Sequence, residues 1–144
     1  MARRREFVNP ERTRNQAYRE VLKEIQKEGK CPFCPGNFNW HREPIICEFD
    51  GWLLTKASWP YENAKHHFLL IPKEHKEELA DVTAEDFKTI VILVSTAFNR
   101  FNLKGAGLAV RFGSPEYTGA SVKHIHFHLI SPEIEKGHVD FPIG

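Results

Sequence analysis

Hydrophobic residues recur at two different spacings along this chain, and each spacing predicts one kind of element. Residues 15–28 are rich in charge and carry apolar side chains at helical spacing, namely Tyr18, Val21, Leu22 and Ile25. Gly29 follows, at a position where helices commonly end. A second helical stripe begins after Thr83, which can cap a helix, and comprises Phe87, Ile90, Val91, Val94, Phe98 and Phe101. We expect an N-terminal helix and one long helix, each buried along its stripe.

The remaining apolar segments are short and separated by turn residues, which is typical of strands. Two of them, in "PIICEFDGWLLTKA", are joined by Asp50 and Gly51, a pair suited to a tight hairpin turn. The segment "HHFLLIPKEH" predicts a strand that ends at Pro72, because proline has no amide hydrogen to donate to a sheet. "GLAVRFG" and "VKHIHFHLI" predict two more strands, on either side of the loop "SPEYTGAS". Several strands around one long helix predict an α+β fold with a mainly antiparallel sheet.

Composition narrows the possible partners. The chain has 144 residues, of which 41% are hydrophobic, enough for one core, and we expect an N-terminal helical extension over residues 1–30 and one main domain over residues 31–144. Lysine and arginine number 20 against 19 acidic residues, so net charge favours neither nucleic acid nor a membrane as partner. No apolar run approaches the roughly 20 residues of a membrane span, and the charged start lacks the apolar segment of a signal peptide. We expect Arg3, Arg4 and Arg5 to be solvated.

The stretch "SVKHIHFHLIS" places His124, His126 and His128 at every second position. In a strand, successive side chains point to opposite faces, so the three imidazoles would share one face while Ile125 and Phe127 enter the core. Neighbouring histidines would lie roughly 6.5 Å apart, which allows them to share one bound ligand. A polar outer face on an edge strand is the plain alternative, and three histidines in strict register argue against it.

The pair "CPFC" has the spacing with which two thiolates chelate one zinc ion. A redox pair uses the same spacing, but the flanking Pro32, Pro35 and Gly36 favour a knuckle-like loop. Three cysteines also argue against a disulfide framework, so we expect a reducing, cytoplasmic location. Further ligands could come from His41, His66, His67, His75 or a member of the triad, and spacing alone does not choose among them.

Taken together, these segments resemble the histidine-triad superfamily. "HIHFHLI" is similar to the family motif of three histidines separated by apolar residues, and "GASV" is similar to its glycine-x-serine-valine lead-in. "HHFLLIPKEH" resembles the family strand that ends in Ile-Pro-Lys-x-His, and "CPFC" resembles the cysteine pair of its zinc-bearing branch. The resemblance covers about residues 31–132, in the expected order.

The resemblance implies a role for each matching residue. His126 would be the nucleophile that attacks an α-phosphate, His128 would donate to the phosphate oxygens, and Ser121 would supply a hydroxyl to the phosphate or leaving group. Backbone amides of the loop that contains Gly119, Ala120 and Val122 would bind substrate. A structural zinc ion would be held by Cys31, Cys34, His75 and His124. The family's usual homodimer is the expected assembly.

One departure from the family concerns the sugar. Small phosphoramidate hydrolases of the superfamily carry a ribose-binding aspartate before the Ile-Pro-Lys strand, and "LLTKASWPYENAKHH" has none. Trp59, Tyr61 or Asn63 could line the nucleoside site instead, and we retain Asn63 as the substrate-binding candidate. Arg111 and Lys123 could bind a polyphosphate, but as isolated basic residues we expect them at the surface.

Three functional hypotheses follow. The first is a nucleotidyl hydrolase or transferase that cleaves nucleoside phosphoramidates, dinucleoside polyphosphates or related nucleotides through a nucleotidyl-histidine intermediate. The second is a nucleotide-binding regulatory protein with little catalysis. The third is a zinc-knuckle module that binds RNA or protein through "CPFC" and the basic start, which leaves the triad unexplained.

Overall fold

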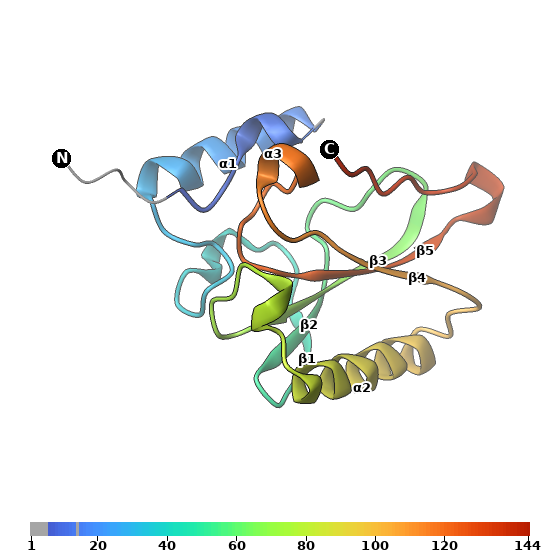
Figure 1. Cartoon of the computed structure of the whole chain (residues 1–144). Helices are drawn as coiled ribbons and strands as arrows, with labels where there is room; N and C mark the ends of the chain where they lie inside the picture. The colour runs from blue at the N-terminus through green and yellow to red at the C-terminus, as the bar shows by residue number, and fades with distance from the viewer. Residues whose placement is uncertain (1–5, 14) are drawn as a thin grey trace.

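One five-stranded antiparallel sheet, in the order β1-β2-β3-β5-β4, forms the centre of the fold (Figure 1). The computed structural model describes residues 6–13 and 15–144, so the expectation for Arg3, Arg4 and Arg5 lies outside the described residues. The strands are β1 (Ile45–Phe49), β2 (Trp52–Lys56), β3 (Ala64–Pro72), β4 (Gly107–Val110) and β5 (Phe127–Pro132). The helices are α1 (Gln16–Glu28), α2 (Ala84–Arg100) and the short α3 (Pro115–Thr118). The predicted α+β class with a mainly antiparallel sheet is confirmed.

The loops contain single turns of 3-10 helix at Pro10–Arg12, Phe38–Trp40, Leu79–Asp81 and Ile134–Lys136. No helix of the described part of the chain is long and apolar enough to cross a membrane. The division of the chain at residue 30 stays a prediction.

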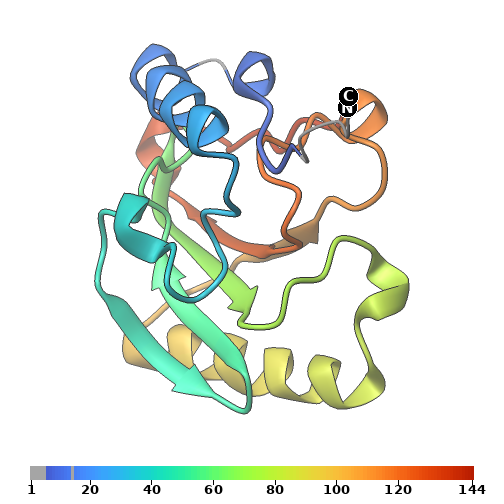
Figure 2. The same ribbon diagram turned by 90° about the vertical axis from the view of Figure 1, so that its left-hand side faces the viewer.

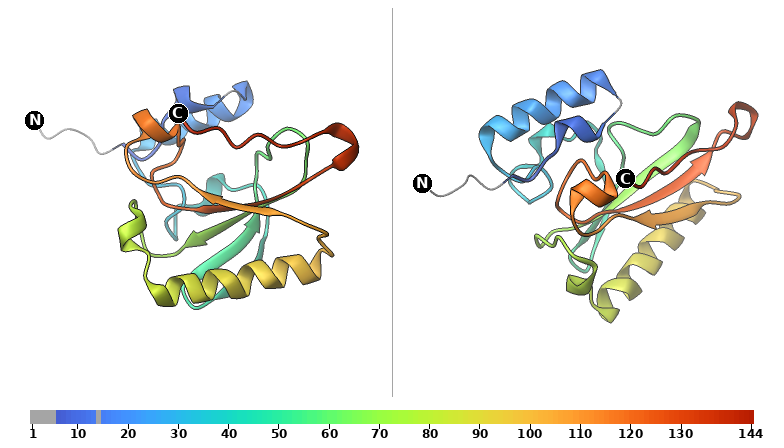
Figure 3. Two further views of the ribbon diagram at one scale, coloured as in Figure 1. Left: turned by 45° about the vertical axis from the view of Figure 1, so that its right-hand side comes forward. Right: turned by 45° about the horizontal axis from the view of Figure 1, so that its top comes forward.

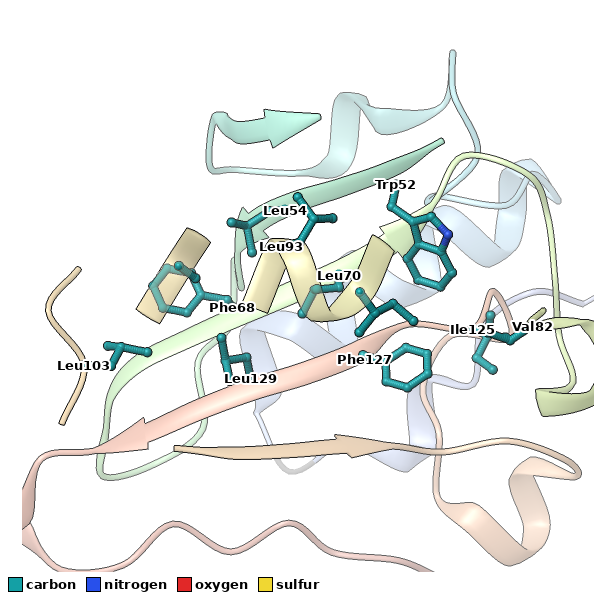
Figure 4. Packing of buried hydrophobic residues seen from close by; sticks show 12 residues of the cluster. Trp52, Leu54, Phe68, Leu70, Val82, Leu93, Leu103, Ile125, Phe127 and Leu129 are labelled. Carbon is teal, nitrogen blue, oxygen red and sulfur yellow. The ribbon is translucent and has the colours of Figure 1, made fainter. Parts of the chain in front are cut away.

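The two faces of the sheet carry different layers. α2 lies against one face, while α1 and the loop after it lie on the opposite side (Figures 1 and 2). The pairing of β3 with β5 sets Phe68 opposite Leu129 and Leu70 opposite Phe127, and these side chains form the core beneath α2 (Figure 4). Because side chains alternate along a strand, the residues between them face α1 instead.

Local signals explain where the elements begin and end. The side chain of Asn15 accepts a hydrogen bond from the Tyr18 amide, which caps α1, and Gly29 ends that helix in the left-handed conformation (φ 67°). Asp50 and Gly51 both have positive φ and join β1 to β2, so the predicted hairpin is confirmed. Thr83 and Asp86 form a capping box at the start of α2.

The predicted buried stripe of α2 was wrong in part. Ile90 is buried as predicted, but Phe87, Val91 and Phe98 are 41%, 62% and 37% exposed. The residues that turn into the core are Thr89, Ile90, Leu93 and Ala97. α2 has apolar residues around most of its circumference, so helical periodicity alone did not show which side meets the sheet.

The triad was expected within one strand, but β5 begins only at Phe127. His124 and His126 precede it, in a segment where the Ile125 amide donates to the Lys76 carbonyl at 2.6 Å instead of to a neighbouring strand. β3 has already ended at Pro72, so the sheet offers no partner at this level. We call residues 124–128 the triad segment.

Residues 7–9 hold the lead-in to the triad from outside the sheet. Val8 forms an isolated β-bridge with Val122, the Asn9 amide donates to the Ser121 carbonyl at 2.8 Å, and the Lys123 amide donates to the Phe7 carbonyl at 2.7 Å. Val8 and Val122 share a small second core with Leu22 and Ile25 of α1. Residues 7–9 are therefore packed onto the loop that carries Ser121 and leads into the triad segment.

Candidate active site and metal centre

A cavity lies between α1, the cysteine loop, β3 and the triad segment. Apolar side chains of α1 form one wall, including Leu22 and Ile25, and His126, His128 and Ser121 lie opposite. The structure therefore brings the three predicted catalytic residues to one cavity.

His126 has a hydrogen-bond arrangement that selects one tautomer. Its Nδ1 lies 2.7 Å from the carbonyl oxygen of His124, which can only accept, so Nδ1 carries the proton. Nε2 then has a lone pair. Burial lowers the pKa of His126 to about 4, with a smaller lowering effect from Arg111, so the ring is neutral near pH 7. A neutral imidazole with a free Nε2 is a competent nucleophile.

A chain of hydrogen bonds selects the opposite tautomer for His128. The Tyr61 amide donates to Nδ1 of His67 at 3.1 Å, so the proton of His67 is on Nε2. That Nε2 lies 2.9 Å from Nδ1 of His128, which must accept, so His128 carries its own proton on Nε2. This buried N–H has no partner among the described residues. Buried donors are nearly always paired, so Nε2–H of His128 is available to donate a hydrogen bond to a ligand in the cavity.

The imidazoles of His126 and His128 lie side by side, with ring centroids 4.8 Å apart. Burial is the main cause that lowers the pKa of His67 to about 4 and the pKa of His128 well below its usual value. One ring thus has a lone pair and the other an N–H at the same cavity, so a nucleophile and a donor for a phosphate oxygen lie next to each other.

Sequence reasoning considered His67 only as a metal ligand. It pairs with Ile130 in the β3–β5 ladder, while His128 pairs with Leu69, so the two histidines are diagonal neighbours on the same face. The two adjacent histidines in "HHFLL" were a weak indication of this contact, because in a strand one of two neighbouring side chains must lie on the same face of the sheet as His128. His67 therefore contacts His128 directly, through the 2.9 Å hydrogen bond between its Nε2 and Nδ1 of His128.

Ser121 lies at the edge of the cavity, with its hydroxyl 3.2 Å from the Tyr18 hydroxyl of α1. The Tyr18 ring stacks on Trp59 at 5.5 Å, and burial raises the pKa of Tyr18 to about 12. α1 therefore closes over the side of the cavity where Ser121 lies.

The predicted substrate-binding residues do not all line this cavity. Val122 does, and Ala120 lines a second cavity nearby. Gly119 ends α3 in the left-handed conformation (φ 73°). Asn63 lies apart from both cavities, and its side chain donates to the His138 carbonyl at 3.0 Å.

Arg111 was expected at the surface, but its side chain lines the cavity. Its Nη1 donates to the Tyr61 hydroxyl at 2.9 Å, and the Tyr61 ring stacks on His128 at 5.6 Å. A positive charge therefore lies beside the triad histidines, which favours an anionic ligand.

The second cluster comprises the residues that the family resemblance assigns to zinc. One ligand atom from each of Cys31, Cys34, His75 and His124 lies within 4.8 Å of the others. Sγ of Cys31 is 3.4 Å from Nδ1 of His124, and Sγ of Cys34 is 3.3 Å from Nδ1 of His75. Zinc–ligand bonds of about 2.0 to 2.3 Å in a tetrahedron require separations of about 3.6 Å, so the donor set fits this ion.

Both histidines of the cluster are oriented through their other nitrogen. Nε2 of His75 donates to Glu77 at 2.8 Å, and Nε2 of His124 donates to the Pro72 carbonyl at 2.6 Å. This leaves each Nδ1 free of a proton and directed at the thiols, as metal-binding histidines require. Burial raises the pKa of the Cys31 thiol to about 12, so a bound cation is needed to make it a thiolate.

Comparison with known families agrees with this geometry. The family model described as "Scavenger mRNA decapping enzyme C-term binding" matches residues 30–139, and the chain belongs to this histidine-triad-like family. An "Uncharacterized HIT-like protein" from Chlamydia muridarum is 31% identical over 91 residues, which cover 59% of this chain and 68% of that protein.

Solved structures share the fold. A Zn-bound histidine triad family protein from Mycobacterium smegmatis superposes with a TM-score of 0.58 at 22% identity, over 80% of this chain and 83% of that one. A HIT family hydrolase from Legionella pneumophila Philadelphia 1 gives a TM-score of 0.52 at 25% identity, over 71% and 92% of the two chains.

We predict that the purified protein carries about one zinc ion per chain, and that Cys34→Ser or His75→Ala reduces this to near zero. Cys47, which lies in β1 outside the cluster, provides the matched control, so Cys47→Ser should retain the metal. Elemental analysis by mass spectrometry measures the ratio, and thermal melting with and without a chelator measures the loss of stability. Equal loss of metal in all three variants would contradict the assignment.

Proposed function

We propose that this protein cleaves nucleotides at the α-phosphate through a nucleotidyl-histidine intermediate, as a hydrolase or nucleotidyltransferase. The observation that carries the proposal is the different protonation of two neighbouring nitrogens in the cavity. Nε2 of His126 has a free lone pair, and Nε2 of His128 carries a proton that has no partner among the described residues. The family membership and the neighbouring hydrolase support the same class of reaction.

The proposed reaction has two steps. Nε2 of His126 attacks the α-phosphorus, the bond to the leaving group breaks, and its electron pair departs with that group. Water, inorganic phosphate or another acceptor then attacks the same phosphorus and returns the electron pair of the P–N bond to His126. His128 donates to a non-bridging oxygen in both steps, and Ser121 with the amides of residues 119–122 is proposed to meet the remaining charge.

Zinc is proposed to have a structural role. Four protein ligands leave no coordination position for substrate or water. His124 is both a proposed ligand and the source of the carbonyl that orients His126, so the metal would hold the nucleophile's support in place.

The first test is intact-protein mass spectrometry after brief mixing with adenosine and guanosine phosphoramidates and dinucleoside polyphosphates, with and without inorganic phosphate. We expect a nucleotide-sized adduct on the wild type and none on His126→Ala, because the variant lacks the nucleophile. The released product separates hydrolysis from transfer. Tight nucleotide binding without adduct or product would instead favour the catalytically weak, nucleotide-binding alternative.

A second test addresses the orientation of His128. We expect His67→Phe to lower kcat by about 10- to 100-fold with little change in KM, because His128 loses the donor that selects its tautomer. His66→Phe is the matched control, since His66 stacks on Phe68 on the other side of the strand. A loss of the same size in both variants would show that only the fold was damaged.

We also propose a homodimer, on the basis of an exposed apolar face. Leu108 on the edge strand β4 pairs with Leu129, whose side chain faces α2, so Leu108 lies on the α2 side of the sheet. The exposed apolar residues of α2 are Phe87, Val91, Ile92 and Phe98. A strand edge beside such a surface suits pairing with a second copy.

Light scattering tests the assembly. We expect twice the chain mass for the wild type, and the mass of one chain for a Val91→Asp, Leu108→Asp double variant, because two buried charges would oppose association. Ile134→Asp, also at an exposed apolar residue but in the turn after β5, should leave the dimer intact. A monomeric wild type at micromolar concentration would refute the proposal.

A further inference from the structure

The catalytic cavity has one Lys or Arg side chain among its described lining residues, that of Arg111. Arg111 also lines the second cavity, and Val122 is the other residue common to both. The two cavities are therefore neighbours that share Arg111 and Val122 in their linings. Arg111 thus lies where a group attached to a phosphate at the triad could contact it.

The second cavity has its own positive charge and hydroxyl. Lys123 and Ser114 line it, together with Glu77 and Glu78. Each carboxylate already has a partner elsewhere: Glu77 accepts from His75 at 2.8 Å, and the Glu78 side chain caps a 3-10 turn. The groups of this cavity that can attract an anion are therefore Arg111, Lys123 and the Ser114 hydroxyl, and they lie in the same lining as the two glutamates.

The guanidinium of Arg111 is held in a fixed orientation. Its Nε and Nη2 both donate to the carbonyl oxygen of Pro142, at 2.9 and 2.7 Å, and the group lies 3.8 Å above the Phe141 ring. The tail that supplies these contacts runs back from the turn after β5 toward α3 (Figure 3). Two parallel N–H groups that now share one oxygen form the fork that binds two oxygens of a phosphate.

We infer that Arg111 selects substrates in which the group leaving the α-phosphorus is itself a phosphate, as in nucleoside polyphosphates, over substrates whose leaving group is an amine. This inference rests on the proposed function and narrows its substrate class. The leaving phosphate occupies the second cavity between Arg111 and Lys123, and its oxygens replace the Pro142 carbonyl on the guanidinium fork.

The chemistry of departure agrees with this assignment. When Nε2 of His126 displaces a phosphate, the P–O bond breaks and the electron pair stays on the departing oxygen, which gains one negative charge. Arg111 neutralises that charge directly, and no proton is required. An amine leaving group must instead gain a proton as the P–N bond breaks, and Arg111 cannot supply one because its guanidinium does not give up a proton in proteins. Water then attacks the α-phosphorus, the P–N bond breaks with its electron pair returning to Nε2 of His126, and the proton of the attacking water passes to solvent, so hydrolysis consumes one water molecule for each substrate.

The test compares kcat/KM for diadenosine tetraphosphate and adenosine 5′-phosphoramidate in the wild type, Arg111→Gln and Arg111→Lys. We expect the ratio of the two values, polyphosphate over phosphoramidate, to fall about 10- to 100-fold in Arg111→Gln, the range for loss of a charge-assisted hydrogen bond. Arg111→Lys keeps the charge without the fork and should give an intermediate ratio. Arg100→Gln, at an exposed arginine on α2, should leave the ratio within twofold of the wild type.

A binding measurement covers the case in which Arg111→Gln is too unstable to assay. Calorimetry with inorganic pyrophosphate on His126→Ala, and on His126→Ala combined with Arg111→Lys, should show weaker binding in the double variant. An unchanged ratio in Arg111→Gln, or unchanged pyrophosphate affinity, overturns the role of Arg111. These results leave the nucleotidyl-histidine proposal intact, because that proposal is tested separately by the adduct on the wild type and its absence on His126→Ala.

Discussion

The pairing of β3 with β5 is the constraint on which both sites depend. It sets His67 and His128 on one face of the sheet, and Phe68 opposite Leu129 on the other. A shift of one residue would exchange the two faces and send the histidines into the core beneath α2. The apolar contacts that favour this register therefore also place His67 beside His128.

The end of the same strand pair supports the proposed nucleophile and the candidate metal cluster. Pro72 closes β3, and its carbonyl accepts from Nε2 of His124, which directs Nδ1 of that ring to the cysteines. The carbonyl of His124 then accepts from His126. His124 thus connects the cysteine loop, β3 and the proposed nucleophile His126, and the His124 ring is fully buried. Burial also lowers the pKa of His126 and His128, which keeps both rings neutral near pH 7. Arg111 therefore provides a positive charge in the cavity that does not depend on pH in this range.

Features that depend on local chemistry could be predicted from the sequence. The turn at Asp50 and Gly51 needs only two residues with positive φ, and Asn15 and Gly29 mark the two ends of α1. The family resemblance named four metal ligands that the structure brings together, whereas spacing alone left several histidines open.

Features that depend on contacts between residues far apart in the sequence could not be predicted from the sequence. His67 meets His128 only through a strand register between segments about 60 residues apart in sequence, and no local pattern encodes it. Arg111 looked like an isolated surface charge because its partners, Tyr61 and Pro142, come from two other parts of the chain. The buried side of α2 was ambiguous for a different reason, since a second apolar surface competes with the core-facing one.

The proposed chemistry depends on different tautomers of His126 and His128, which can be measured in long-range ¹H–¹⁵N correlation spectra of histidine-labelled protein at pH 7. We predict the Nδ1–H form for His126 and the Nε2–H form for His67 and His128. An Nε2–H form at His126 would remove the lone pair from the cavity and contradict the proposed role of that residue as nucleophile.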